Sequence, residues 1–141
     1  MGKLSQKIIE LRLATRRACM CEDGGSTKKN TLSLKTKVLF LIEKGCSARE
    51  IIASLVIAKT NLALITTELC REGLITKSKG LVDRREVNFT LTEDGYRYLA
   101  EREKSIEDEI GFYFGSEDEY DHAIEVIAKA IAVLDGNNEE L

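Results

Sequence analysis

The chain has 141 residues, of which 43% are hydrophobic and 32% charged, a mixture typical of a folded domain and not of a disordered one. The net charge of −3 arises at one end: residues 101–141 hold thirteen acidic and three basic side chains, whereas residues 1–37 hold nine basic and three acidic ones. No apolar run approaches the ~20 residues of a membrane span, and the first residues lack a signal-peptide pattern. We therefore expect a cytoplasmic protein with reduced thiols and no membrane partner.

The first half of the chain contains three short-to-medium predicted helices. Apolar residues at helical spacing indicate a helix over residues 4–20, and turn residues follow at 22–27. A second helix is predicted over residues 33–44, with Gly45 as its stop. Ser47 and Glu50 have the spacing of a capping box, which opens a third helix that continues to about Leu55.

A fourth helix is predicted from about Ala58 to Glu72, before Gly73. The spacing of three apolar residues predicts its buried side, and polar residues near its start lie on another side. The buried stripe is Leu62, Ile65 and Leu69, and the other face offers Lys59, Thr60, Asn61 and Leu64.

A β-hairpin is predicted directly after this helix. Residues 86–91 alternate, with Val87, Phe89 and Leu91 on one face, and residues 74–79 can form the partner strand. The hairpin tip carries Asp83, Arg84 and Arg85. Two helices joined by a tight turn and followed by a basic-tipped hairpin indicate a winged helix-turn-helix, a fold that most often binds duplex DNA.

Two long helices are predicted to complete the chain. Thr92 caps a helix that continues to about Phe114, and Ser116 with Glu119 has the spacing of a second capping box. The last helix has a heptad seam, whose residues are Tyr120, Ile124, Ile127, Ile131 and Leu134. Such a seam requires a partner helix, either the first helix of the chain or a second copy of the protein.

The fold class expected from these elements is mainly α with a small β-hairpin wing. Residues 1–30 are interpreted as an N-terminal dimerisation helix and linker. Residues 31–95 form the winged helix-turn-helix lobe, and residues 96–141 form C-terminal dimerisation helices. The lack of any proline agrees with long helices.

The stretch from Leu62 to Gly95 resembles the MarR-type transcription regulators. The resemblance depends on the spacing of three groups: Leu69-x-x-x-Gly73-Leu74, Asp83-Arg84-Arg85, and Phe89-x-Leu91-Thr92 followed by Gly95. A weaker resemblance covers residues 32–134. It implies a homodimer with interlocked terminal helices that binds a pseudo-palindromic DNA operator.

The resemblance also implies roles for individual residues. The recognition helix would enter the major groove with Lys59, Thr60, Asn61 and Leu64, and Arg84, braced by Asp83, would reach the minor groove. The chain departs from the family pattern at Leu81, where proline is usual, at Lys77, where arginine is common, and at Ala63 and Leu64, where polar residues are common. These departures affect the choice of operator, and Leu64 could contact a thymine methyl group.

The predicted DNA-binding residues are Lys59, Thr60, Asn61, Leu64, Lys77, Lys79, Asp83, Arg84 and Arg85. A plainer interpretation remains for each group. Arg84 and Arg85 could form surface ion pairs with Asp83 or Glu86, which contribute only ~0–1 kcal/mol. Lys59, Thr60 and Asn61 could be ordinary residues at a helix start.

The late aromatic residues have two interpretations of equal weight. They form either the core of a dimer or a pocket for a small aromatic effector, and the residues concerned are Tyr96, Phe112, Tyr113 and Tyr120. Cys19 and Cys21 are either thiol sensors of oxidants or packing residues in a helix interface. The lone His122 could bind a metal only with ligands from another chain.

No catalytic motif, phosphate loop or dinucleotide loop is present, so we expect no enzyme activity, cofactor or metal. The first functional hypothesis is a sequence-specific, homodimeric DNA-binding regulator, a repressor, released by a small-molecule effector. The second is a winged-helix module that binds another protein and does not bind DNA.

Overall fold

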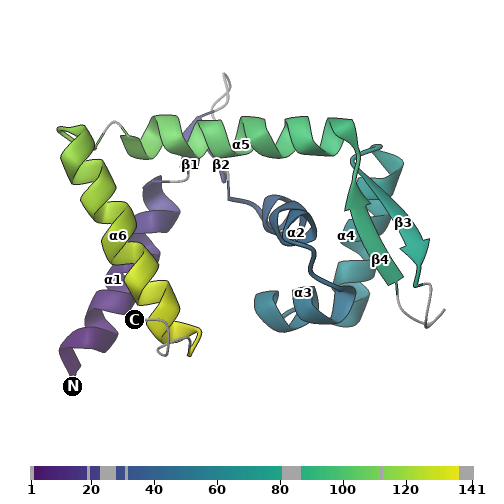
Figure 1. Cartoon of the computed structure of the whole chain (residues 1–141), viewed down its shortest axis with the longest axis horizontal. Helices are drawn as coiled ribbons and strands as arrows, with labels where there is room; N and C mark the ends of the chain where they lie inside the picture. The colour runs from purple at the N-terminus through teal and green to yellow at the C-terminus, as the bar shows by residue number, and fades with distance from the viewer. Residues whose placement is uncertain are drawn as a thin grey trace. The chain divides into compact units, whose positions relative to one another are not determined.

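The computed structural model describes residues 2–18, 20–22, 28–30, 32–80, 87–111 and 113–136. The chain forms two compact units, residues 1–106 and residues 107–141. Figure 1 shows the elements. The helices are α1 (Gly2–Ala18), α2 (Leu34–Glu43), α3 (Ala48–Leu55), α4 (Lys59–Arg71), α5 (Glu93–Gly111) and α6 (Glu117–Leu134), and the strands are β1 (Met20–Glu22), β2 (Lys28–Asn30), β3 (Ile75–Lys79) and β4 (Val87–Leu91). This content confirms the fold class: mainly α-helix with a two-stranded antiparallel wing.

The core of the first unit lies among α2, α3, α4 and the β3–β4 hairpin. Its fully buried side chains are Val38, Leu39, Ile51 and Leu69, one or two from each of the three helices. Leu74, Ile75, Leu91 and Leu99 extend the core to the hairpin and α5. Each fully buried aliphatic side chain contributes ~1.5–3 kcal/mol, so this cluster provides the main stabilisation of the lobe.

The predicted capping box of α3 is confirmed. The hydroxyl of Ser47 accepts from the Glu50 N–H at 3.2 Å, and the Glu50 carboxylate accepts from the Ser47 N–H at 3.2 Å. The second predicted box is only half formed. Ser116 accepts from the Glu119 N–H at 3.3 Å, but the Glu119 carboxylate accepts from the Gly115 N–H at 2.9 Å. The Glu119 carboxylate thus binds the N–H of Gly115, the residue before the N-cap Ser116.

The two-residue alternation of the second wing strand is also confirmed. In β4 the side chains of Val87, Phe89 and Leu91 are half-buried or buried, and those of Asn88 and Thr90 are exposed. β3 and β4 pair antiparallel, from Ile75 opposite Leu91 to Lys79 opposite Val87.

Two local features differ from the sequence prediction. β1 and β2 pair antiparallel, with Met20 opposite Asn30, where a helix to residue 20 and a break at residues 22–27 were predicted and no strand was. α5 ends at Gly111 and not at Phe114, because the chain then tightens into i−3 bonds: the N–H of Tyr113 donates to Ile110 and that of Phe114 to Gly111.

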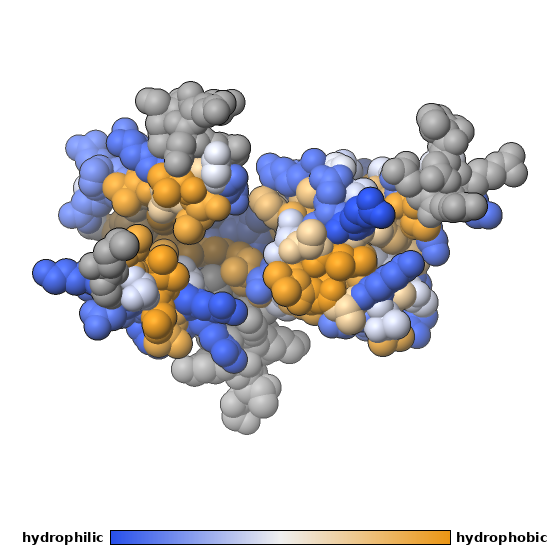
Figure 2. Space-filling view, turned by 90° about the horizontal axis from the view of Figure 1, so that it is seen from below, coloured by the Kyte–Doolittle hydropathy of each residue, from blue (hydrophilic) through white to orange (hydrophobic). Residues whose placement is uncertain are grey.

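Apolar side chains remain uncovered on both terminal helices. On α6 the predicted seam is about half exposed: Ile124 52%, Ile127 51%, Ile131 54% and Leu134 73%. On α1, Leu4 is 70% exposed and Leu11 53%. Figure 2 shows apolar residues, in orange, gathered on the surface of each of these helices. Within the described part of the chain, no single helix is long and apolar enough to cross a membrane. The bent pair of α3 and α4, with 116° between them, has the length and composition of a membrane span only when both helices are counted together.

Candidate nucleic-acid interface

The second helix of the helix-turn-helix, α4, has one buried and one open side. Leu62, Thr66 and Leu69 are buried, and Thr66 satisfies its hydroxyl by donating to the Leu62 carbonyl at 2.9 Å. The predicted contact residues Lys59, Thr60, Asn61 and Leu64 are all exposed. The structure therefore leaves these four side chains of α4 accessible to solvent.

The N-terminus of α4 is suited to a phosphate. Its N-cap residue is Ala58, which has no side-chain oxygen to accept from the N–H groups of the first turn. These donors and the positive end of the helix dipole attract an anion, and the ammonium of Lys59 lies on the same first turn. A phosphate of the DNA backbone can therefore accept hydrogen bonds from these uncapped N–H groups.

A turn with a left-handed residue connects α3 to α4. Val56 has φ 53° and ψ 52° and is 89% exposed. This left-handed backbone conformation is unfavourable for a β-branched residue. Glycine is the usual residue at such a position. The turn holds α4 at an angle of 116° to α3, so that its start is presented to solvent.

The end of α4 fixes where the wing begins. Gly73, with φ +76°, forms a Schellman motif: its N–H donates to the Cys70 carbonyl and the Leu74 N–H donates to Leu69, both at 3.0 Å. The chain therefore reverses directly into β3, beside α4, as Figure 1 shows.

Thr92, which lies between β4 and α5, forms hydrogen bonds with the segment that connects α4 to β3 and with the first turn of α5. Its N–H donates to the Leu74 carbonyl at 3.0 Å, its hydroxyl donates to the Gly73 carbonyl at 2.6 Å, and the same oxygen accepts from the Gly95 N–H at 3.0 Å. A Cβ at Gly95 would lie 2.0 Å from the Leu74 oxygen, so only glycine fits there. These contacts give a physical reason for the Leu-Thr-x-x-Gly spacing in this chain.

The described part of the wing carries two exposed lysines. Lys77 lies opposite Phe89 and Lys79 opposite Val87, so each lysine shares a face with an apolar residue of β4. That arrangement lets an aliphatic stem lie on the hairpin while the ammonium stays in water. Asp83, Arg84 and Arg85 lie outside the described residues.

Three charged residues, Lys35, Glu72 and Arg102, make contacts within the fold. Lys35 pairs with Glu72, and its ammonium also lies 5.1 Å from the centre of the Tyr98 ring. The guanidinium of Arg102 lies at the same distance from that ring. These contacts tie α2, the end of α4 and α5 together, so Lys35 and Glu72 serve the fold and are not placed in the interface.

Two further residues of the open face were not predicted from the sequence. Thr67 and Arg71 follow Leu64 at i+3 and i+7, so helical periodicity places them on the same side, and both are exposed. The same spacing rule could have found them. Arg71 adds a cation at the far end of the face from Lys59.

Solved structures of other proteins share this arrangement. A MarR-family transcriptional regulator from Rhodococcus sp. RHA1 matches with a TM-score of 0.71 and 15% identity over 94% of this chain and 92% of that one. The chain has the winged helix-turn-helix fold of the MarR-type regulators. The transcriptional repressor CouR, bound to a 23-mer DNA duplex, matches at 0.60 and 22% identity over 93% and 96%. CouR from Rhodococcus jostii RHA1, bound to p-coumaroyl-CoA, matches at 0.59 and 22% identity over 93% and 90%. No family model matches the sequence, and neither does a curated protein.

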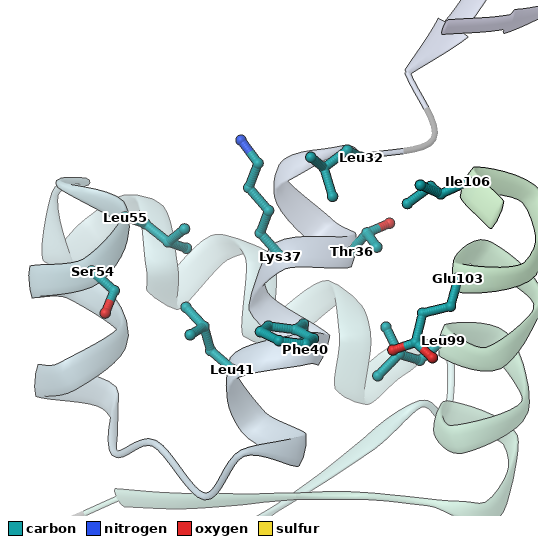
Figure 3. Close-up of a pocket in the computed structure, with 10 residues that line it drawn as sticks. All are labelled: Leu32, Thr36, Lys37, Phe40, Leu41, Ser54, Leu55, Leu99, Glu103 and Ile106. Carbon is teal, nitrogen blue, oxygen red and sulfur yellow. The ribbon is translucent and has the colours of Figure 1, made fainter. Parts of the chain in front are cut away.

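A pocket of about 390 Å³ lies within the first unit. Figure 3 shows α2 in its middle, α3 on one side and α5 on the other, with the Lys37 ammonium turned away and the Glu103 carboxylate near Leu99. The ten lining residues are mostly apolar: Leu32, Thr36, Lys37, Phe40, Leu41, Ser54, Leu55, Leu99, Glu103 and Ile106.

This pocket does not include the predicted aromatic set. Tyr96 is 52% exposed and Tyr113 74% exposed, and Phe112 lies outside the described residues. Tyr120 donates to both carboxylate oxygens of Glu107, at 2.7 and 2.6 Å, and this bond raises the pKa of the phenol. The aromatic set thus stays a sequence prediction, and the pocket is a second candidate for an effector.

The remaining sequence candidates are the two N-terminal cysteines and His122. Cys19 lies outside the described residues, and Cys21 is opposite Lys29 in the β1–β2 pair. The described residues contain no group of three metal-binding side chains, and His122 is exposed on α6.

Proposed function

We propose that this chain is a cytoplasmic, sequence-specific regulator of transcription that binds duplex DNA as a homodimer and acts as a repressor. The observation that carries the proposal is the open face of α4, with the uncapped helix start and Lys59 at one end and Arg71 at the other. The likeness to CouR, which has been solved on a DNA duplex, supports this use of the fold.

In the proposed complex each lobe would use two contact regions. The open face of α4 would enter the major groove, and the wing, with Lys77, Lys79 and the tip residues Asp83, Arg84 and Arg85, would follow the adjacent backbone and minor groove. Lysine and arginine contacts to phosphate would supply most of the affinity, and the α4 side chains would select the sequence.

The proposed dimer would bury the uncovered apolar surface of the terminal helices. The seam of α6 and the apolar residues of α1 are half or more exposed, and such long apolar stripes are seldom left in water. Segments 1–30 and 96–141 would thus hold two copies of the lobe at residues 31–95. Their recognition helices would lie about 34–36 Å apart, one turn of DNA.

Two measurements test the proposal together. Light scattering should give a mass of two chains, and a mobility-shift titration should show duplex binding that weakens steeply with added salt, because phosphate contacts release counterions. A monomer with no duplex binding at ~50 mM salt, where phosphate contacts are strong, would contradict it. That result would favour the protein-binding module instead.

We also propose that a small aromatic effector controls DNA binding. The pocket has a volume within the ~300–1,000 Å³ of small-molecule sites and an apolar lining between α2 and α5, which links the lobe to the dimerisation segment. A ligand there would shift the population of lobe positions that fit DNA. CouR has been solved with p-coumaroyl-CoA, whose p-coumaroyl group is a small aromatic group, so that compound is a suitable first probe.

A variant that fills the pocket tests this second proposal. Ser54 is exposed at the pocket wall, so Ser54→Trp can occupy the space with little cost to folding. We expect p-coumaroyl-CoA to release the wild-type protein from DNA and to leave the variant bound. An equal response of both proteins would place the effector elsewhere, and the residues Tyr96, Phe112, Tyr113 and Tyr120 would then be the next candidates.

A further inference from the structure

Leu64 has no role in the fold of the lobe. Its side chain is 73% exposed, although burial of a leucine is worth ~1.5–3 kcal/mol and α4 has a buried side that holds Leu62, Thr66 and Leu69. Leu62 and Leu69 on that side are 3% and 0% exposed. The leucine at position 64 therefore lies on the open face, where it can contact a partner and not the core.

The row of α4 that contains Leu64 has few groups that read bases by hydrogen bonding, and the polar side chains of Asn61 and Glu68 flank it at i−3 and i+4 from Leu64. Thr60, Leu64, Thr67 and Arg71 form one row along α4 at intervals of four, three and four residues, with Ala63 beside it. The hydroxyl of Thr67 donates to the Ala63 carbonyl at 2.7 Å, so its proton is used within the helix. What remains at the centre of the row is the isobutyl group of Leu64 and the methyl groups of Thr67 and Ala63.

Charges at both ends orient this apolar centre toward DNA. Lys59 begins α4 and Arg71 ends it, twelve residues apart, which corresponds to about 18 Å at 1.5 Å per residue. That distance exceeds the ~12 Å width of the major groove, so cations at the ends can lie near phosphates while the centre faces base edges. Thymine is the one standard base that presents a methyl group in this groove.

We propose that Leu64, with the methyl groups of Ala63 and Thr67, makes α4 a reader of thymine methyl groups. This inference rests on the proposed function, because it specifies which base the DNA-binding face selects. It means that the operator carries thymines at the positions opposite the centre of α4, and that removing their 5-methyl groups weakens binding without any change in base pairing.

The experiment uses a duplex selected from random-sequence DNA by the full-length wild-type protein. A second copy of that duplex carries deoxyuridine in place of every thymidine, which removes only the 5-methyl groups. Both duplexes are titrated with wild type, Leu64→Met and Leu64→Asn, and thermal unfolding checks that the variants are folded. The methionine variant keeps an apolar side chain of similar volume, whereas the asparagine variant replaces it with a polar one.

For wild type and Leu64→Met we expect the deoxyuridine duplex to bind about fourfold more weakly for each methyl group in contact, since a buried group of that size is worth ~0.8 kcal/mol. For Leu64→Asn we expect a smaller loss, because only the methyl contacts of Ala63 and Thr67 remain. Equal binding of both duplexes by wild type, or the same loss in all three proteins, would overturn the inference. Failure to select any duplex would instead overturn the proposed function itself.

Discussion

Substitution of Gly95 by alanine tests the junction that joins the wing to the recognition helix. A Cβ at this position would lie 2.0 Å from the Leu74 carbonyl oxygen, and that oxygen already accepts from the Thr92 N–H at 3.0 Å. To restore a separation of 3.0 Å the two groups must move apart by about 1 Å, which the backbone on both sides resists.

The expected loss of stability follows from three contributions. Overpacking of this size costs ~1–3 kcal/mol, and weakening of the Thr92 bond to Leu74 costs a further ~0.5–1.5 kcal/mol. The higher helix propensity of alanine offsets ~1 kcal/mol of that total. We therefore expect Gly95→Ala to lower the free energy of unfolding by about 1–3 kcal/mol.

Gly111→Ala is the matched control, because it makes the same change in the same helix. A Cβ at Gly111 meets nothing within 4 Å, so only the propensity term remains and stability should stay equal or rise by up to ~1 kcal/mol. Urea unfolding at one fixed chain concentration measures both variants, since unfolding of a dimer depends on concentration. A Gly95→Ala protein as stable as Gly111→Ala would refute the reasoning.

Four further predictions follow from the interface and the local structure. Arg84→Ala should weaken duplex binding by ~1–3 kcal/mol and leave the mass in light scattering unchanged, and equal DNA affinity would reject the minor-groove role. Val56→Gly should raise the free energy of unfolding by up to ~1 kcal/mol by relieving the left-handed valine, and a less stable variant would contradict that strain. Ser47→Ala should lower it by ~1 kcal/mol through loss of the α3 cap, and unchanged unfolding would show that the cap contributes little. The bond to Glu107 raises the pKa of Tyr120 by stabilising the neutral phenol, so this contribution is present below the ordinary pKa of ~10 and is lost as pH rises through the raised pKa. Alkaline absorbance titration should show Tyr120 ionising at lower pH in Glu107→Gln, and superimposable curves would contradict this.

Features with a local cause could be predicted from the sequence. The alternation of β4, the capping box at Ser47 and the stop at Gly73 each depend on residues within a few positions of one another. These three features could therefore be predicted without knowledge of the rest of the chain. The apolar seam of α6 was predicted in the same way. In the structure its side chains are about half exposed, which agrees with a surface that packs against a partner helix.

Features that combine distant residues could not be predicted in the same way. The bond from the Thr92 hydroxyl to the Gly73 carbonyl links positions 19 apart, and the pocket takes its residues from α2, α3 and α5. No periodicity in one segment indicates such contacts. The partner of the Glu119 carboxylate was mispredicted because the N–H groups of Gly115 and Ser116 are adjacent, and only the geometry of the chain decides between them.

The most direct test of the account is the stoichiometry and salt dependence of the complex with a duplex recovered from genomic DNA by the protein. We expect two chains per duplex, with contacts to two half-sites one helical turn apart, and a logarithm of affinity that falls linearly with the logarithm of the salt concentration. One chain per duplex, or no recovered duplex that the purified protein binds again, would contradict it.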